Sequence, residues 1–502
     1  MSVLTPAYNS EPRYLRELYQ TLRNQRYAHW EWVIVDDGST DARTVATLRE
    51  LAQGDPRIHL TLSPDNLGIS GASNIALAAV SGTHTALVDH DDLVARDAFL
   101  SIYEAWKIAS SAQLFFTDEC KLLADGRLGQ FWAKPDWSPA YLENTMCLGH
   151  LSVYETSFLR ALGGFRSDYD GTQDFDLALR ASLTRPEVVH VPVFAYLWRV
   201  IPGSAATDIH EKHYAIERQG RAVLEYARHK HPDATVCPGW GAGYWRIHYP
   251  LPSPAPLLSY VIPTGGGSRT IRGENIDLSL NCIRSFENAQ FYPNREYVVV
   301  HHGCLTPEQM TALAAINGVR LIRQNTGSLN FAEMVSIGVA AARGAFVCLL
   351  GDDVEAITHQ GGHELVGYLA ANSTVGAIGP MCLFEDGSIR QKGMLLSAFG
   401  PARAGSHQPA DFGGHHAILR CRRECLFIDA AMMIMRKTIY EASGGFDEKF
   451  PLRYNEVDLG VRLRDRGLSC IVDPGVRVYH FDENEKPNVD FDEEEYSLLK
   501  YT

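Results

Sequence analysis

The stretch "WVIVDDGSTD" (Trp32–Asp41) is an apolar run that ends in two acidic residues and a Gly-Ser turn. Its length and its β-branched residues predict a buried strand, and the turn residues predict where the strand ends. The second half of the chain has a matching stretch, "REYVVVHHG" (Arg295–Gly303), which ends in two histidines. The chain therefore carries one element twice, with the charged residues exchanged in the second copy.

The same order of strands and helices surrounds both copies. The first half gives strands at "SVLTPAYN", "EWVIVDDGS" and "HTALVDHDD", and the second gives "LLSYVIPT", "REYVVVHHG" and "AFVCLLGDD", with amphipathic helices between them. Strands that alternate with helices predict an α/β fold with a mostly parallel sheet in each half. Ligands of such sheets bind at the carboxyl ends of the strands, and the acidic residues fall there.

The repeat predicts two domains in tandem. "ALGGFRSDYDGTQDFDLALR" in the first half parallels "ASGGFDEKFPLRYNEVDLGVRLR" in the second. The intervening stretch "YPLPSPAPLLSY" is rich in proline, as linkers are. We predict an N-terminal domain at 1–248, a linker at 249–258, a C-terminal domain at 259–484 and an acidic tail at 485–502.

Composition excludes some classes of partner. Of 502 residues, 45% are hydrophobic and 21% charged, and the formal net charge of −14 disfavours nucleic acids and anionic membranes. The ten cysteines are scattered and complete no zinc pattern, which fits a reducing compartment. A strand begins near the first residue, and no apolar stretch reaches the roughly 18 residues of a spanning helix. These features predict a cytoplasmic protein, peripheral at most to the inner face of the membrane.

Several motifs together resemble the family 2 glycosyltransferases, which have the GT-A fold, a Rossmann-like α/β fold. They are "VDDGSTD", "NLGISGASNIAL", "LVDHDD" and "GTQDFDLALR" in the first half, and "SGGFDEKF", "NEVDLGVRLRDRG" and "VYHFDEN" in the second. The tandem arrangement is similar to that of bacterial O-antigen and capsule biosynthesis. The resemblance covers nearly the whole chain and implies two GT-A domains in tandem.

The resemblance also implies an activity. It implies an inverting, metal-dependent transferase that moves sugars from nucleotide sugars to a growing, lipid-linked surface polysaccharide, with one or both domains active. Two alternatives stay open. One domain could be a structural or acceptor-binding module, or the whole chain could bind nucleotide sugars or glycans without catalysis.

Nucleotide binding is expected at the strand ends. Asp36 and Asp37 can accept hydrogen bonds from a pyrimidine N3–H and from ribose hydroxyls, which favours a UDP- or dTDP-sugar; the alternative is a solvated Asp-Gly-Ser turn. Further contacts of the first half are expected at Pro6, Tyr8, Asn66, Gly68, Asn74 and Asp89. Those of the second half are expected at Pro263, His301, His302 and Asp352.

The "DHDD" stretch is rich in the oxygen ligands that Mg²⁺ and Mn²⁺ prefer. The resemblance assigns Asp91 to the metal and Asp89 to the ribose, and it places Asp353 and His480 at the metal of the second half. In the first half no histidine flanks the Trp198–Arg199 pair, and only His210 and His213 could substitute. The first metal site therefore stays open.

The resemblance places the catalytic bases at Asp174 and Glu456, where a carboxylate takes the proton of the acceptor hydroxyl. The alternative is an acid that stabilises a helix N-terminus, a role that suits Asp176 and Asp458 better. "FWAKPDWSP" suggests acceptor contacts at Trp132, Lys134 and Trp137, or else a packed surface loop.

The two histidines of the second half change the chemistry of that strand end. A neutral histidine offers one donor and one acceptor, whereas a carboxylate only accepts. His301 and His302 could therefore suit a base such as cytosine, stack on a base, or mark a domain that has become a scaffold.

Overall fold

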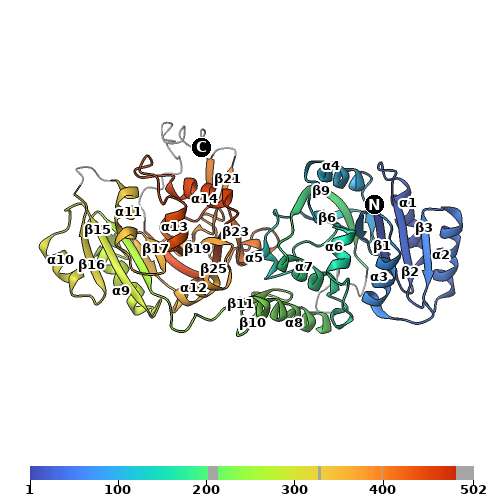
Figure 1. Cartoon of the computed structure of the whole chain (residues 1–502), viewed down its shortest axis with the longest axis horizontal. Helices are drawn as coiled ribbons and strands as arrows, with labels where there is room; N and C mark the ends of the chain where they lie inside the picture. The colour runs from blue at the N-terminus through green and yellow to red at the C-terminus, as the bar shows by residue number, and fades with distance from the viewer. Residues whose placement is uncertain (202–212, 326–329, 398–399, 482–502) are drawn as a thin grey trace. The chain divides into compact units, whose positions relative to one another are not determined.

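The computed structural model describes residues 1–201, 213–325, 330–397 and 400–481 (Figure 1). The chain forms two compact units, Met1–Ile247 and His248–Thr502. The predicted acidic tail and His210 lie outside the described residues.

The first unit is built on one mixed sheet. Its strand order is β3-β2-β1-β4-β8-β6-β9-β5, with β7 paired to β6, and the pairs among β3, β2, β1 and β4 are parallel. The strands are β1 (Ser2–Ala7), β2 (Glu31–Asp36), β3 (Ile58–Leu62), β4 (His84–Leu87), β5 (Leu93–Val94), β6 (Leu114–Leu122), β7 (Leu128–Trp132), β8 (Ser152–Glu155) and β9 (Val188–Arg199).

Helices connect these strands. They are α1 (Pro12–Arg23), α2 (Ala42–Gly54), α3 (Gly68–Ala79), α4 (Ala98–Ile108), α5 (Pro139–Leu142), α6 (Thr156–Ala161), η1 (Ser167–Tyr169), α7 (Gln173–Leu183) and α8 (His213–Lys230), and a small sheet of β10 (Thr235–Pro238) and β11 (Trp245–His248) ends the unit. Asp41, the last acid of the opening motif, is the N-cap of α2, and its side chain accepts a hydrogen bond from the Arg43 N–H. Asp41 thus begins a helix, and Asp36 and Asp37 remain for the site.

The second unit repeats the plan. Its order is β16-β15-β12-β17-β24-β19-β25-β18, which matches the first sheet strand for strand. β20 pairs with β19 as β7 pairs with β6, and β23 is added at β25. The strands are β12 (Leu258–Thr264), β15 (Arg295–His301), β16 (Val319–Arg323), β17 (Phe346–Leu350), β18 (Val354–Ala356), β19 (Val375–Leu383), β20 (Ile389–Gln391), β23 (Arg423–Cys425), β24 (Met432–Arg436) and β25 (Ser469–His480).

The helices of the second unit are α9 (Leu278–Asn288), α10 (Pro307–Ala314), α11 (Phe331–Ala341), α12 (Gly361–Ala371), η3 (His415–Arg420), α13 (Lys437–Ala442) and α14 (Asn455–Asp465). Two hairpins stand apart from the main sheet: β13 (Ser268–Ile271) with β14 (Glu274–Asp277), and β21 (Met394–Ser397) with β22 (Gly400–Arg403). The expected α/β architecture, with two such domains in tandem, is confirmed.

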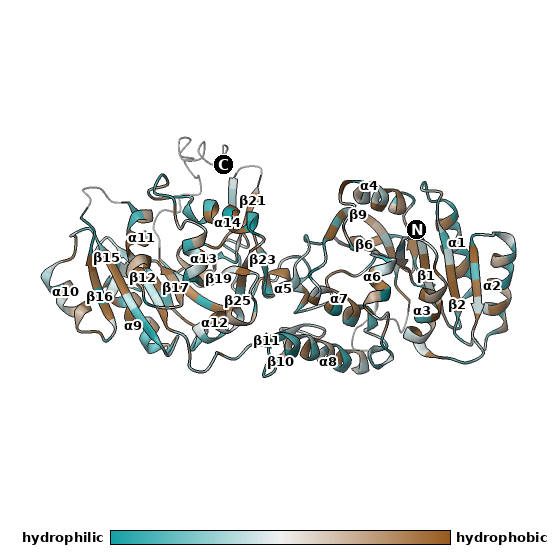
Figure 2. Ribbon diagram, viewed as in Figure 1, coloured by the Kyte–Doolittle hydropathy of each residue, from teal (hydrophilic) through white to brown (hydrophobic). Residues whose placement is uncertain are grey.

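Each unit has its own apolar core. Figure 2 shows the central strands coloured as hydrophobic, and the exposed helix faces as hydrophilic. Trp32 and Ile34 of β2 are buried in the first unit, as are Val261 of β12 and Val347 of β17 in the second. Because these strands are covered on both faces, only their ends can present polar groups to a ligand.

Helix α8 forms hydrogen bonds with the loop that leads into α7. The Arg218 guanidinium donates a hydrogen bond to the Asp170 carbonyl, and the Tyr169 hydroxyl donates one to Glu225 at 2.5 Å. These contacts fix the backbone just before Asp174, the expected base.

Candidate active site

The carboxyl end of β2 holds a buried carboxylate with an unused oxygen. Asp36 is 2% exposed, and its Oδ2 accepts a hydrogen bond from the Ser39 N–H at 3.2 Å. Its Oδ1 is buried and has no hydrogen-bond partner among the described residues. A buried acceptor without a donor costs free energy, so this oxygen is suited to a donor supplied by a ligand.

Its neighbour Asp37 fixes the next loop. The Asp37 Oδ1 accepts a hydrogen bond from the Leu67 N–H at 2.7 Å, just before α3. Asn66 accepts a bond from the Gly68 N–H at 3.2 Å, and Gly68 has a φ of +77°. A Cβ at Gly68 would lie 2.4 Å from an Asp170 oxygen, so glycine lets α3 begin against the loop before α7.

Pro6 and Tyr8 follow from β1. Pro6 pairs with Val35 of β2, and the Tyr8 side chain is 45% exposed. The Tyr8 ring is therefore available for stacking near the end of β2.

Asn74 has a structural role that the sequence did not indicate. Its Nδ2 donates to the Phe165 carbonyl at 2.8 Å, and its Oδ1 accepts from the Phe165 N–H at 2.9 Å. Both polar atoms of the amide are thus used to join α3 to the Gly-Gly-Phe turn. A contact of Asn74 with the nucleotide sugar stays a prediction.

Three aspartates crowd the loop after β4. Asp92 is buried, and it accepts bonds from the Tyr196 hydroxyl and from the Arg199 N–H, each at 2.7 Å. Burial, with Asp89 and Asp91 nearby, raises the pKa of Asp92 well above its ordinary value. Burial also raises the pKa of Asp91, although His90 opposes this shift. A divalent cation would relieve this repulsion.

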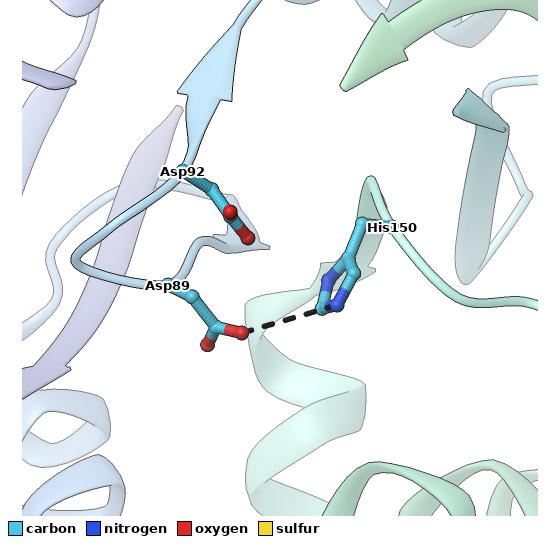
Figure 3. A group of neighbouring side chains, drawn as sticks. All are labelled: Asp89, Asp92 and His150. Carbon is cyan, nitrogen blue, oxygen red and sulfur yellow. Dashed lines mark ion pairs between the residues drawn. The ribbon is translucent and has the colours of Figure 1, made fainter. Parts of the chain in front are cut away.

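A histidine from the loop before β8 completes this cluster. Asp89, Asp92 and His150 each place one ligand atom within 4.8 Å of the others. Figure 3 shows the His150 ring pointing toward Asp89, with Nε2 3.9 Å from the Asp89 Oδ2. The His150 ring stacks on Tyr196 at 4.5 Å between centroids. Two carboxylates and an imidazole suit Mn²⁺ or Mg²⁺, so the donor set fits the expected metal.

Sequence reasoning missed Asp92 and His150. The family resemblance pointed to a histidine near the end of the domain, and it assigned Asp91 to the metal. The group of three that the structure gathers leaves Asp91 out. The only signal for His150 was its place just before the strand "SVYE", opposite the end of β4.

Lys134 holds the backbone of His150. Its Nζ is buried and donates to the carbonyls of Leu148 and His150, each at 2.5 Å, and it lies 3.0 Å from Oε2 of Glu119. The same Glu119 oxygen accepts a bond from the His150 N–H at 2.6 Å. A fourth contact joins Lys134 to the Thr117 carbonyl. Protein oxygens thus surround the ammonium group of Lys134, and its contact with the acceptor stays a prediction.

The two tryptophans of that prediction are half-buried. Trp132 lies in β7 and its ring faces the Lys134 ammonium at 5.0 Å. Trp137 lies just before α5. Acceptor stacking by these rings stays a prediction.

Asp174 and Asp176 differ sharply, although both lie in the first turn of α7. Asp176 is buried and ion-paired with both Arg166 and Arg180, so it stabilises the fold. Asp174 accepts a bond from the Phe175 N–H. Burial raises the pKa of Asp174, with His150 lowering it and Asp89 raising it further, so Asp174 lies beside the cluster.

The second unit has its own pair of ligands. His480 ends β25, and its Nε2 lies 3.4 Å from Oδ1 of Asp353. His480 is 8% exposed, and its Nδ1 is buried without a partner among the described residues. In the first unit β5 pairs with β9, as β18 pairs with β25 in the second. When these two strand pairs are aligned, Trp198 of β9 occupies the position of His480 in β25. The histidine of the first unit therefore precedes β8, whereas that of the second unit ends β25.

Asp352 precedes Asp353 in the sequence, and a hydrogen bond ties it to the end of β12, where Pro263 lies. The Thr264 hydroxyl, next to Pro263, donates to Asp352 at 2.6 Å. Burial raises the pKa of Asp352 to about 6, with Asp353 adding to the shift.

The two expected bases, Asp174 and Glu456, lie at matching places in the two units. Glu456 lies in the first turn of α14, as Asp174 does in α7. Asp458 is ion-paired with Arg462, as Asp176 is with Arg180.

Comparison with known proteins identifies the first unit. Residues 2–120 match the model of glycosyl transferase family 2. The chain carries a glycosyl transferase family 2 domain. It is 30% identical over 499 residues to the uncharacterized protein y4gI of Sinorhizobium fredii, covering 98% of this chain and 54% of that protein. It is 27% identical over 486 residues to the O-antigen biosynthesis protein RfbC of Myxococcus xanthus, covering 96% of this chain and 37% of RfbC.

A solved structure, S. aureus TarS, is 20% identical with a TM-score of 0.36, and the match covers 46% of this chain and 39% of TarS. This chain thus spans about half or less of the length of these relatives. Among the described residues, none of the helices is both long enough and apolar enough to cross a membrane.

Proposed function

We propose that this family 2 protein is an inverting, metal-dependent transferase that adds sugars from nucleotide-sugar donors to a lipid-linked surface polysaccharide. The observation that carries the proposal is the buried Oδ1 of Asp36 at the end of β2, which has no partner among the described residues. Asp174 lies near Asp89 and His150, which affect its pKa. The relation to a protein named for O-antigen biosynthesis supports the class of acceptor. Such an acceptor would be met at the cytoplasmic face of the membrane.

The donor of the first unit is a UDP- or dTDP-sugar. Uracil and thymine carry a proton on N3, and the free Asp36 oxygen is an acceptor for it. The exposed Tyr8 ring can stack on the base. Asn66 and Gly68 shape the loop that follows β3 and faces the same strand end.

A Mn²⁺ or Mg²⁺ ion would be held by Asp89, Asp92 and His150, with Asp91 as a further candidate. The bound ion offsets the charge of the diphosphate. In the second unit Asp353 and His480 would hold the equivalent ion, since the His480 Nε2 lies 3.4 Å from the Asp353 Oδ1.

Asp174 acts as the general base. Its pKa is raised by burial, which makes the carboxylate a stronger base toward an acceptor hydroxyl. The hydroxyl oxygen attacks the anomeric carbon as its proton passes to Asp174, and the nucleoside diphosphate leaves from the opposite face. Attack opposite the leaving group inverts the anomeric carbon.

Glu456 serves a second acceptor hydroxyl, so the chain is bifunctional. The test assays Asp174→Asn and Glu456→Gln with donor sugars, Mn²⁺ and an acceptor glycan. Each variant should lose a different sugar addition. Loss with Asp174→Asn alone would make the second unit a structural or acceptor-binding module. Full activity in both variants would refute the proposed function.

A further inference from the structure

The two units present opposite hydrogen-bonding groups at one position of the fold. Asp36 is the last residue of β2 and pairs with Ala7 of β1, and His301 is the last residue of β15 and pairs with Thr264 of β12. The two sheets have the same strand order, so these side chains stand at matching strand ends. Both are buried, with His301 6% exposed.

The structure fixes the tautomer of His301. The Gly303 N–H donates a hydrogen bond to the His301 Nδ1 at 3.2 Å, so Nδ1 acts as the acceptor. Burial, with Arg323 and His302 nearby, lowers the pKa of His301 and keeps the ring neutral. A neutral ring that accepts at Nδ1 carries its proton on Nε2. His301 therefore offers a ligand a donor, where Asp36 offers an acceptor.

The neighbouring strand strengthens this reversal. His301 pairs with Arg323 at the end of β16, whereas Asp36 pairs with Leu62 at the end of β3. A Cβ built on Gly303 would lie 3.0 Å from Nη2 of Arg323, so the guanidinium lies against this turn. The second strand end thus combines a neutral donor with a cation, and the first presents carboxylates.

We propose that the second unit binds a cytidine nucleotide, with the Nε2–H of His301 donating to N3 of cytosine. Cytosine has an unprotonated N3, which accepts a hydrogen bond. Uracil has N3–H at the same place, so its donor would face the Nε2–H donor of His301. Arg323 can donate to O2 of the base. This inference deepens the proposed function, since it takes the second unit as a donor site, and it is independent of catalysis by the first.

The test uses the full chain with Mn²⁺ and a saturating concentration of UDP, so that the first unit is filled. CDP is then titrated by calorimetry, because it differs from UDP only at N3 and C4 of the base. CDP should bind a second site at least about tenfold more tightly than UDP binds there, as expected from one mismatched buried hydrogen bond. Absence of CDP binding would overturn the inference.

Two variants of His301 make the test specific. His301→Asp should reverse the preference toward UDP, and His301→Gln, which keeps a donor, should retain CDP. His359→Asp makes the same exchange at an exposed histidine of this unit and should leave the preference unchanged. An unchanged preference in His301→Asp, with an unchanged unfolding temperature, would refute the assignment. UDP binding by the first unit is measured separately, so failure of this inference can be distinguished from failure of the proposed function.

Discussion

The His150 Nε2 lies 3.9 Å from the Asp89 Oδ2, although the two residues come from loops beside separate strands of the first sheet. Asp89 follows β4, and His150 precedes β8, which pairs with β4. In the second unit the corresponding histidine, His480, comes from the end of β25. The first unit therefore supplies the imidazole by a different route, and Trp198 stands in the place of His480.

His150→Ala should weaken Mn²⁺-dependent UDP binding by the first unit, because one of three proposed ligands is lost. We expect a decrease of about tenfold or more in Mn²⁺ affinity, measured by calorimetry with UDP present. His59→Ala removes an exposed histidine of the same unit and is the matched control. Unchanged Mn²⁺ affinity in His150→Ala would exclude the histidine from the site.

Asp36→Asn should lower UDP affinity and leave the fold intact. In the variant the amide oxygen still accepts the hydrogen bond from the Ser39 N–H. The amide nitrogen then takes the place of the free Oδ1, so a donor of the side chain meets the N3–H donor of the base. A mismatch of this kind costs about 1–3 kcal/mol. UDP titration and thermal unfolding are measured together, and equal UDP affinity in both proteins would contradict the assignment.

Asp174→Asn and Asp176→Asn should separate catalysis from stability. Loss of the general base lowers the rate by about 10² to 10⁴, while UDP binding and unfolding temperature are retained. Asp176→Asn should instead lower the unfolding temperature, because the charges of Arg166 and Arg180 lose their partner. A stable and active Asp174→Asn would show that another group takes the proton.

Lys134→Met should destabilise the first unit by about 3–5 kcal/mol, because the buried Glu119 would lose its partner. The double variant Lys134→Met/Glu119→Gln should regain part of that loss, since it leaves no unpaired charge. Urea unfolding measures both. If Lys134 served the acceptor instead, the single variant would keep its stability and raise only the acceptor KM.

Lys392 should make stability depend on pH in the alkaline range. Burial lowers its pKa to about 8, with Arg477, Arg420 and Arg423 adding to the shift from 10.5. The folded state then binds fewer protons than the unfolded state between about pH 8 and 10.5, so stability rises with pH across this window.

The measurement compares denaturant unfolding of the wild type and Lys392→Met at several pH values. The Ala410 and Phe412 carbonyls lose their donor in this variant at every pH, so only the slope reports the titration. Equal slopes in the two proteins would contradict the lowered pKa.

The sequence by itself determined the repeated α/β plan, because strand and helix periods are local and survive in each half. It also placed Asp36 and His301 at strand ends, since the apolar runs before them are buried strands that end there. The positions of Asp174 and Glu456 in the first turns of α7 and α14 followed from the same local patterns.

Only the tertiary structure decided which side chains meet. Lys134 and Asn74 look like ligand contacts in the sequence, yet protein backbone occupies both. His150 belongs to no motif in the sequence, and it lies near Asp89 because β8 pairs with β4. The tautomer of His301 rests on one backbone N–H. Such contacts depend on strand pairing and on loops packed against one another, which local sequence patterns do not encode.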